Sequence, residues 1–490
     1  MKIIINNSKN SSGQLALQIL LYSALAMIFL SGFLVWANAV SDYVIRYSDR
    51  FRALEIAEAG IEYYRWHLAH DSGDYQDGTG HLGPYAHDYY DKSGNLIGQF
   101  VLDITPPPSG STIVTIKSTG LVVSDPTISK VVQVKLGIPS YTKYAAAVNA
   151  AVRFGQGTEV FGAIHSNGGI RFDGVVHNIV TSALSSYDDP DHSGNNEFGV
   201  HTHVNVPPAT GVNDNFRPLE APTSTIMNRS DVFMAGRQFP VPAIDFSGIT
   251  ADLTQMKTSA KSNGFYASSS GVQGYHVVLK TNDTFDLYRV NSLATTSSNC
   301  YNSLGQSGWG SWSIRSGGEQ LIGNYPFPAN NLIFIEDNLW IDGQINDARL
   351  TIGSAVFPDN PNTRSSITVN NNLLYTNYDG RDALGLIAQN NFNVGMVSTS
   401  TLRIDGAIIA QNGRAGRYYY RSGCSPYNLR QDITLYGMMM SNQRYGFAYT
   451  DGTGYQTRNL VYDSNLLYGP PPDFPLTASS YQIISWEEIK

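Results

Sequence analysis

Residues 15–40 read LALQILLYSALAMIFLSGFLVWANAV and contain no charged side chain. This uncharged stretch lies between Lys9 and Asp42, and Lys2 lies farther toward the N-terminus. An apolar stretch of about 20 residues crosses a bilayer as a helix, because hydrocarbon tolerates only internally hydrogen-bonded backbone. Positive charge on the short flank favours a cytoplasmic N-terminus. The sequence therefore predicts a single-pass membrane protein whose body is extracytoplasmic, at the cell surface.

A secretory signal peptide is the main alternative for this stretch, because Ala37, Asn38 and Ala39 match the small-x-small pattern of a cleavage site. The core of a signal peptide spans only about 7–15 residues, however. Beyond the stretch, apolar residues recur at three- and four-residue steps, at Leu54, Ala57, Ile61, Tyr64 and Leu68. That spacing marks one face of an amphipathic helix. We therefore expect one helix over residues 14–70 that begins in the membrane and ends outside it.

The segment ALEIAEAGIEYY at residues 53–64 follows on the emerging half of this helix. With the short basic leader and the uninterrupted apolar helix before it, it resembles the N-terminus of type IV pilins, especially PilX-like minor pilins. The rest of the chain resembles, more diffusely, uncharacterised β-rich extracellular regions behind such N-termini. The AEAG phrase typical of the family is present here as Ala57, Glu58, Ala59 and Gly60. Small residues there allow the helix to pack closely on a neighbour or on its own sheet.

The resemblance also implies a leader at residues 1–13, which a peptidase removes after Gly13 so that Gln14 begins the mature chain. The family usually has Phe or Met where this chain has Gln14. Gln18 stands where major pilins have glutamate, and this departure resembles the tip-type members. The resemblance thus implies contact with other pilin-like subunits through the N-terminal helix. A single-span anchor that is never processed is the alternative.

Residues 71–143 are expected to form an antiparallel β module. Three strand-like runs, GQFVLDI, STIVTIKSTGLVV and TISKVVQVKLGI, occupy most of residues 98–138. Pro106 to Pro108 and the pair Asp125-Pro126 separate these runs as turns. Alternation makes one face of the sheet largely apolar. We therefore expect this sheet to pack on the half of the helix that leaves the membrane.

From residue 144 onward, short strand-like runs alternate with Gly and Asn turns, as in VRFGQGTEVFGAIHSNGGIRFDGVV (residues 152–176). Short strands with such corners are typical of a parallel β-helix or solenoid. We expect the first coils at 144–186, a small α/β insertion at 187–327, and the solenoid body with a C-terminal segment at 328–490. The fold class is mainly β with a long N-terminal α-helix, α+β overall. A β-sandwich is the alternative for the body.

Two cysteines, Cys300 and Cys424, lie in similar polar, turn-like contexts, SSNCYNS and RSGCSPY. A body outside the cytoplasm is in an oxidising environment, which favours a disulfide between them. Two unpaired thiols are the alternative.

The run YDDPDHSGNNEFGVHTH at residues 187–203 is the richest in metal-binding residue types. His201 and His203 would point the same way from a strand, which is a usable spacing for a metal. The run also holds Glu197, and a solvated loop is the alternative. The candidate metal ligands, with calcium and zinc both open, are Asp188, Asp189, Asp191, His192, His201 and His203.

Composition excludes several function classes. The net charge is −8, and no Lys/Arg run occurs in the body, so nucleic-acid binding is not predicted. The chain has no GxSxG, HExxH, Walker or CxxC motif, and we expect neither enzyme activity nor a cofactor. The carboxylates Glu336, Asp337 and Asp342 leave an exported polysaccharide-active enzyme as one alternative.

Together these patterns predict a non-catalytic minor or tip component of a type IV pilus-like assembly, with an extracellular body for adhesion or partner contact. The abundant tyrosines offer a surface for a glycan or protein ligand. A stand-alone membrane-anchored surface protein is the second alternative.

Overall fold

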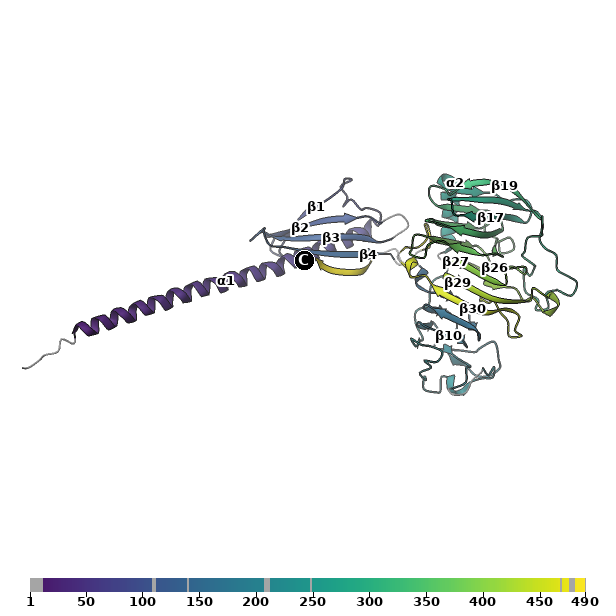
Figure 1. Ribbon diagram of the computed structural model, residues 1–490, viewed down its shortest axis with the longest axis horizontal. Helices are drawn as coiled ribbons and strands as arrows, with labels where there is room; N and C mark the ends of the chain where they lie inside the picture. The colour runs from purple at the N-terminus through teal and green to yellow at the C-terminus, as the bar shows by residue number, and fades with distance from the viewer. Residues whose placement is uncertain are drawn as a thin grey trace, which may run out of the picture. The chain divides into compact units, whose positions relative to one another are not determined.

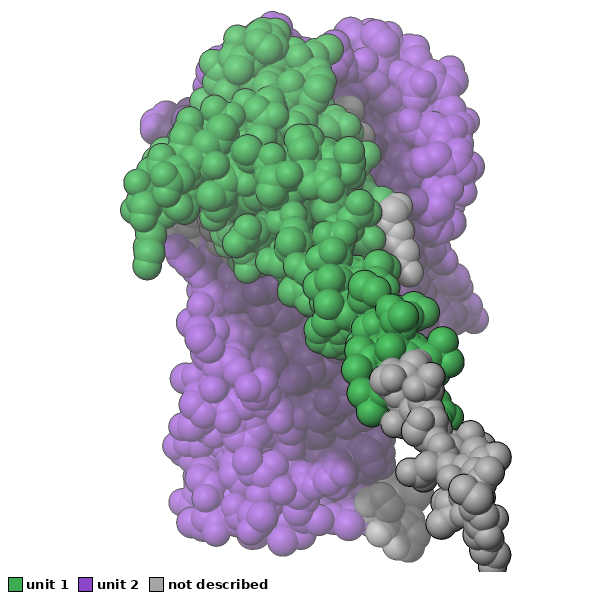
Figure 2. Space-filling view, turned by 90° about the vertical axis from the view of Figure 1, so that its left-hand side faces the viewer, with its two compact units in different colours: residues 1–106, 114–137, 480–490 green, residues 107–113, 138–479 purple. Residues whose placement is uncertain are grey.

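The computed structural model describes residues 12–107, 112–138, 141–206, 212–246, 249–467, 469–475 and 481–489. The chain divides into two compact units (Figures 1 and 2). Unit 1 comprises Met1–Pro106, Val114–Gly137 and Ser480–Lys490, and unit 2 comprises Pro107–Ile113 and Ile138–Ser479.

Unit 1 begins with α1 (Ser12–His70), a continuous helix of 59 residues. No proline precedes Pro84, so no residue of the helix lacks its backbone donor. Its N-terminal half exposes apolar side chains on every face, including Leu17, Ile28 and Val35. From Ala53 onward one face is buried, and it includes Ile56, Ile61 and Leu68. The single unbroken helix is therefore as the sequence predicts.

The antiparallel sheet of unit 1 has the order β1-β2-β3-β4-β31. Its strands are β1 (Tyr85–Tyr90), β2 (Leu96–Thr105), β3 (Val114–Val122), β4 (Ser129–Gly137) and β31 (Gln482–Ile489). The three runs predicted as strands are β2, β3 and β4. Helix α1 packs on this sheet, and the side chains of both form one buried cluster.

One domain boundary predicted from the sequence is wrong. The C-terminal segment does not belong to the solenoid body at 328–490, because β31 pairs antiparallel with β4 of unit 1. Lys130 contacts Glu488, and Gln133 donates a hydrogen bond of 2.6 Å to Glu487, so paired polar side chains align the two strands. Unit 2 is thus inserted between the last two strands of the sheet.

Close approach of α1 to the sheet depends on glycines in both elements. A Cβ atom at Gly60 of α1 would lie 2.9 Å from the Phe100 ring, and one at Gly120 of β3 would lie 2.0 Å from the carbonyl oxygen of Ala53. Of the four AEAG residues, Ala57 and Gly60 are buried against the sheet, Ala59 is half-buried and Glu58 is exposed. Within the chain, this phrase therefore packs the helix on its own sheet.

Unit 2 is built from parallel strands stacked coil upon coil. The longest column runs, in spatial order, through β16 (Phe265–Ala267), β20 (Leu332–Ile335), β22 (Arg349–Ser354), β25 (Ala383–Ala388), β27 (Thr401–Ala410), β29 (Leu429–Ser441), β5 (Ala146–Val148), β8 (Ile164–Ser166), β11 (Val180–Ser182) and β15 (Arg237–Gln238). Parallel pairing throughout this column gives the solenoid-like body and excludes the β-sandwich alternative.

Two further sets of parallel strands complete the coils. One branches at β21 (Leu339–Ile345), which pairs with β17 (Gly274–Lys280), β23 (Ile367–Val369) and β24 (Leu373–Tyr375). Strands β26 (Phe392–Val394) and β28 (Ala415–Arg417) continue from β23, β24 pairs onward with β27, and β30 (Gly454–Tyr462), β7 (Thr158–Phe161) and β10 (Val175–Val176) continue from β29. The other contains β6 (Val152–Phe154), β9 (Ile170–Phe172) and β14 (Val200–His201). Apolar side chains of all these columns fill one continuous interior core.

The chain enters this stack in its middle. Residues from β5 onward coil toward one end of unit 2, and the chain then crosses to the other end and coils back (Figure 1). The returning strand β29 pairs with the first strand of the body, so that Met439 lies beside Ala146. Stacked positions are separated by 16 residues at Ile164 and Val180, by 34 at Ile352 and Leu386, and by 68 at Phe265 and Ile333. This variation explains why no fixed period is visible in the sequence.

Residues 187–327 are not the separate α/β insertion that the sequence predicts. Helix α2 (Ile249–Asn263) lies against the flank of the coils, where Leu253, Met256 and Ala260 pack with Phe334 and Ile409. Strands β16 and β17 join the parallel columns, and β18 (Thr284–Val290) and β19 (Glu319–Pro326) extend them as an antiparallel meander. The segment belongs to the body because its apolar side chains complete the cores of the coils.

Candidate functional site

The predicted leader site lies at the start of α1. Gly13 and Gln14 are in the first turn of the helix, and residues 1–11 of the predicted leader lie outside the described residues. Beyond them, large apolar side chains are exposed, including Leu25 at 43% and Phe29 at 76%. In the described part of the chain, α1 is the helix whose length and composition suit a membrane span.

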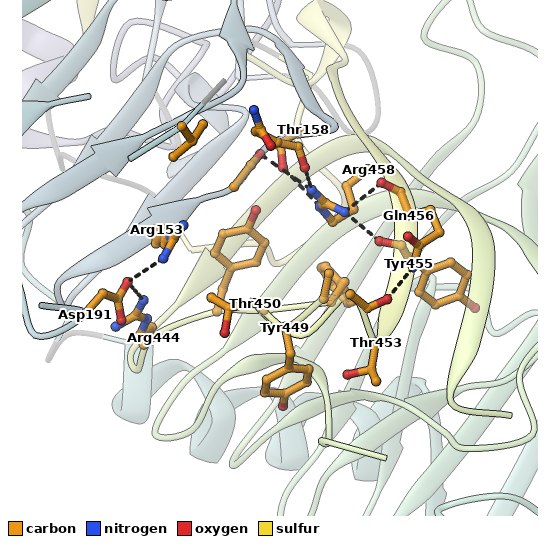
Figure 3. Close-up of a pocket in the computed structure, with 18 of the residues that line it drawn as sticks. Arg153, Thr158, Asp191, Arg444, Tyr449, Thr450, Thr453, Tyr455, Gln456 and Arg458 are labelled. Atoms are coloured by element: carbon orange, nitrogen blue, oxygen red, sulfur yellow. Dashed lines mark hydrogen bonds and ion pairs between the residues drawn. The ribbon is translucent and has the colours of Figure 1, made fainter. Parts of the chain in front are cut away.

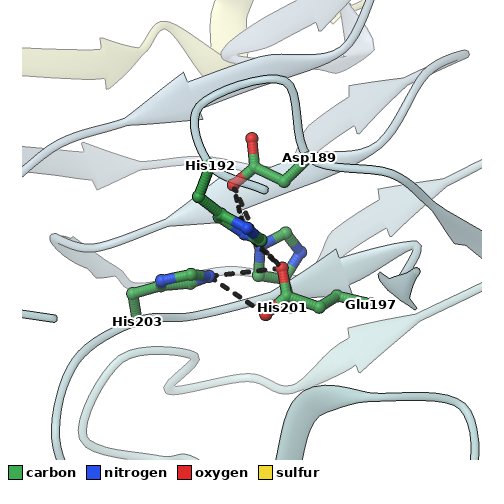
Figure 4. Close-up of side chains that lie close together, drawn as sticks. All are labelled: Asp189, His192, Glu197, His201 and His203. Carbon is green, nitrogen blue, oxygen red and sulfur yellow. Dashed lines mark hydrogen bonds and ion pairs between the residues drawn. The ribbon is translucent and has the colours of Figure 1, made fainter. Parts of the chain in front are cut away.

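Five side chains of the run at 187–203 converge in unit 2, and we call them the histidine–carboxylate cluster (Figure 4). Its members are Asp189, His192, Glu197, His201 and His203, and one possible ligand atom from each lies within 4.8 Å of all the others. All five side chains are at most 5% exposed. The structure thus builds a buried group of nitrogen and oxygen donors from a polar loop.

The local backbone structure explains why these five side chains lie close together. Strands β12 (Ser186–Tyr187) and β13 (Glu197–Phe198) pair antiparallel and close the loop that carries Asp189 and His192. His201 ends β14, next to Arg171 of β9 in the parallel register. His201 and His203 are two residues apart in extended backbone, so both rings point to the same side.

The predicted ligand set differs from this cluster at three positions. Asp188 is exposed and stands outside the cluster. Asp191 turns away, and its Oδ2 atom lies 2.5 Å from Nη2 of Arg444 and 3.7 Å from Nη1 of Arg153. Glu197, which is not among the predicted ligands, contributes a carboxylate oxygen to the cluster. The sequence pattern could not separate Asp189 from Asp191, because turn geometry and a partner from a distant coil decide which of them faces inward.

The two carboxylates of the cluster are held in the ionised form. Burial alone would raise the pKa of Asp189, but nearby His201, the amide of Asp191 and the charge of Arg171 outweigh it and lower that pKa. Burial likewise opposes ionisation of Glu197, whereas His203, His201 and the amide of Arg217 lower its pKa below the usual range. The cluster therefore presents two negative charges to three imidazole rings.

A second feature of unit 2 is an open pocket of about 690 Å³ (Figure 3). Its lining residues include Arg153, Arg414, Arg444, Arg458, Tyr449 and Tyr455. Figure 3 shows Arg153 and Arg444 both directed at Asp191. Asp191 therefore belongs to the wall of this pocket, whereas Asp189, two residues earlier, belongs to the histidine–carboxylate cluster.

The two cysteines are joined in the structure. Cys300 and Cys424 form a disulfide with an S–S distance of 2.03 Å across 124 residues of sequence. Around it, Met396, Tyr418 and Tyr420 are buried in a small apolar cluster. Tyr418 and Tyr420 therefore stabilise the body rather than form part of an exposed tyrosine patch.

The three carboxylates considered for polysaccharide chemistry each have a partner. Glu336 pairs with Lys257 and accepts a hydrogen bond from Tyr266. Asp337 accepts a hydrogen bond of 2.7 Å from the amide of Ser270, and Asp342 lies 3.3 Å from His276.

His276 gives the body a measurable pH dependence. Burial lowers its pKa, but Asp342 and Glu319, whose carboxylate lies 2.7 Å from Nδ1, outweigh burial and raise that pKa to about 9. The ion pairs therefore stabilise the fold fully below the ordinary histidine pKa of about 6.5, and this contribution disappears as the pH rises through about 9. We expect a loss on the order of 3 kcal/mol in the free energy of unfolding over this window.

Urea unfolding at pH 6 and pH 9 checks this expectation, with the variant His276→Gln as the comparison. The wild-type protein should lose stability between the two pH values, and the variant should lose much less of it. An equal loss in both proteins would assign the pH dependence to other groups.

Helix α1 and the antiparallel sheet give unit 1 a pilin-like arrangement, in a chain whose apolar N-terminal helix suits a membrane anchor. No family model and no curated protein matches the chain. Among solved structures, the competence-associated pilin ComZ from Thermus thermophilus aligns with 90% of this chain and 98% of its own, at 14% sequence identity and a TM-score of 0.30. That TM-score is too low to indicate a shared fold, so the arrangement rests on this chain's own helix and strands.

Proposed function

We propose that this chain is a non-catalytic minor or tip-type component of a type IV pilus-like assembly. In this proposal α1 crosses the membrane with its N-terminus in the cytoplasm and packs among the helices of other pilin-like subunits. The body is then extracytoplasmic, where it contacts a glycan or protein partner. We infer the type of assembly, a type IV pilus-like one, from the sequence resemblance to PilX-like minor pilins.

The division of α1 into two halves is the observation that supports this proposal. Over residues 15–47 apolar side chains are exposed around the whole helix, whereas the C-terminal half buries one face against the sheet of unit 1. An apolar surface of that length requires a cover of lipid or of other apolar helices. When a subunit moves from the membrane into a filament, the apolar helices of other subunits replace lipid around this surface.

The pocket of unit 2 supports partner contact by the body. Arginine and tyrosine are the side chains most enriched where proteins bind partners, because they combine apolar area with hydrogen-bond donors. A partner with carboxylate or hydroxyl groups suits this lining.

Two measurements on the protein from its native membrane test the proposal. Mass spectrometry should find Gln14 as the first residue, and a photo-crosslinking residue at Leu25 should couple the chain to other pilin-like subunits. The same crosslinker at Lys92, in an exposed turn of unit 1, is the control and should not produce these products.

Each alternative hypothesis predicts a different result in these measurements. A chain that begins at Val40 would be a secreted protein, and an intact leader without crosslinks would indicate a stand-alone anchor. Release of products from polysaccharides by the purified protein would replace the non-catalytic assignment with an enzyme.

A further inference from the structure

We propose that the histidine–carboxylate cluster binds one divalent transition-metal ion, with Zn²⁺ as the preferred ion. The ion would fix the loop between β12 and β14 against the parallel coils. This inference is independent of the proposed function, because it concerns residues of unit 2 alone.

The histidines are oriented as metal ligands. Nδ1 of His203 lies 2.7 Å from the carbonyl oxygen of Asn213, and Nδ1 of His201 and of His192 lie 3.3 Å from the carbonyl oxygens of Phe198 and Ser193. A carbonyl oxygen only accepts hydrogen bonds, so each Nδ1 carries the ring hydrogen. In a neutral imidazole the lone pair is then on Nε2, and all three Nε2 atoms face the centre of the cluster.

The carboxylates are oriented in the same way. Oδ1 of Asp189 accepts a hydrogen bond of 3.0 Å from the amide of Asp191, which leaves Oδ2 toward the centre. Oε1 of Glu197 accepts one of 2.8 Å from the amide of Arg217, and Oε2 faces His192 and His201. Backbone donors thus hold one oxygen of each group and leave the other available to a cation.

Two atoms at the centre lack a hydrogen bond. Nε2 of His201 lies 3.1 Å from Oε2 of Glu197 and 3.5 Å from Oδ2 of Asp189, but within the described chain neither Nε2 nor Oδ2 forms a hydrogen bond of acceptable geometry. Both side chains are at least 98% buried. A buried polar atom without a partner destabilises the fold, and coordination of an ion would remove that cost.

The spacing of the donors fits one zinc ion. Nε2 of His192 lies 2.9 Å from Oε2 of Glu197 and 3.5 Å from Oδ2 of Asp189. Ligand atoms about 2.0–2.2 Å from a common Zn²⁺ lie roughly 3–4 Å apart. Three imidazole nitrogens favour zinc over calcium, which prefers oxygen ligands. Because protein side chains supply every donor and the group is buried, the ion would be structural and would not have an open position for substrate.

The charges around the cluster also favour a divalent cation. Ion pairs join four carboxylates, from Asp173, Asp189, Asp191 and Asp214, to three guanidinium groups, from Arg153, Arg171 and Arg444. A fifth carboxylate, from Glu197, lies 2.9 Å from His192. These five carboxylates and three guanidinium groups leave two formal negative charges, before the histidines are counted. One Zn²⁺ ion balances them, whereas the alternative is a cluster in which imidazoles are protonated at Nε2.

Zinc binding to the full-length protein in detergent tests this proposal. The protein is stripped with EDTA and then titrated with Zn²⁺ in competition with a chromogenic chelator. We expect one equivalent per chain in the wild type and a loss of affinity of about 100-fold or more in His201→Gln. Co²⁺ in place of Zn²⁺ should give the visible absorption of a four- or five-coordinate nitrogen and oxygen site.

A matched histidine serves as the control. His177 pairs with Glu159 on neighbouring coils, outside the cluster, so His177→Gln should keep its Zn²⁺ affinity within about twofold of the wild type. Glu197→Gln is the second variant if His201→Gln fails to fold, as judged by circular dichroism. A wild type that binds no Zn²⁺ would overturn the proposal, and so would binding that is equal in the wild type and the cluster variants.

Discussion

Full-length protein that carries Leu25→Arg and Phe29→Arg is expected to leave the membrane fraction. Both side chains lie in the middle of the exposed apolar half of α1. Each arginine at the centre of a spanning helix costs about 2.5–3.5 kcal/mol of insertion free energy. The pair should therefore disfavour insertion by about 5–7 kcal/mol. The fraction of protein that resists carbonate extraction, measured by immunoblot, checks this result.

A matched variant places the same charges on the other half of the helix. Glu55 and Glu58 are exposed on α1, away from the face that packs on the sheet. The variant Glu55→Arg with Glu58→Arg should remain in the membrane like the wild type. If the first variant also stayed there, the apolar half of α1 would not be the anchor.

Gly120→Val is expected to destabilise unit 1 by about 3 kcal/mol, the upper end of the usual cost of overpacking a core. The new Cβ atom would lie 2.0 Å from the carbonyl oxygen of Ala53 and 2.6 Å from the amide nitrogen of Ala57. Both contacts are backbone atoms of α1, so the helix as a whole must move away from β3. Urea unfolding followed by circular dichroism measures the loss.

Thr119→Val is the control for this substitution. Thr119 is the neighbour of Gly120 on β3 and is half-buried on the opposite face of the sheet. A valine there should change the free energy of unfolding little. Equal stability of Gly120→Val and Thr119→Val would contradict the close packing of α1 on the sheet.

The elements with strong local patterns could be predicted from the sequence. The charge-free stretch and the following amphipathic spacing predict α1, because both patterns belong to one helix. Alternation predicts β2, β3 and β4. In each case neighbouring residues in the sequence decide the structure.

Elements that depend on distant partners could not be predicted. The short C-terminal strand β31 finds its place only because β4 offers a free edge. The pairing of Met439 with Ala146 places the last coils beside the first. No local sequence pattern predicts this pairing between distant strands. The same limit applies to the candidate metal site. Alternation brings His201 and His203 together, but Arg444, 253 residues away, draws Asp191 out of the cluster.

Protease protection of the full-length protein in lipid vesicles tests the central claim most directly. Helix α1 should cross the bilayer with its apolar half, and the antiparallel sheet of unit 1 and all of unit 2 should remain outside when the protein is inserted from the outer side. After digestion, mass spectrometry should find a protected fragment that contains residues 15–40. Complete digestion of that segment in intact vesicles would contradict the account.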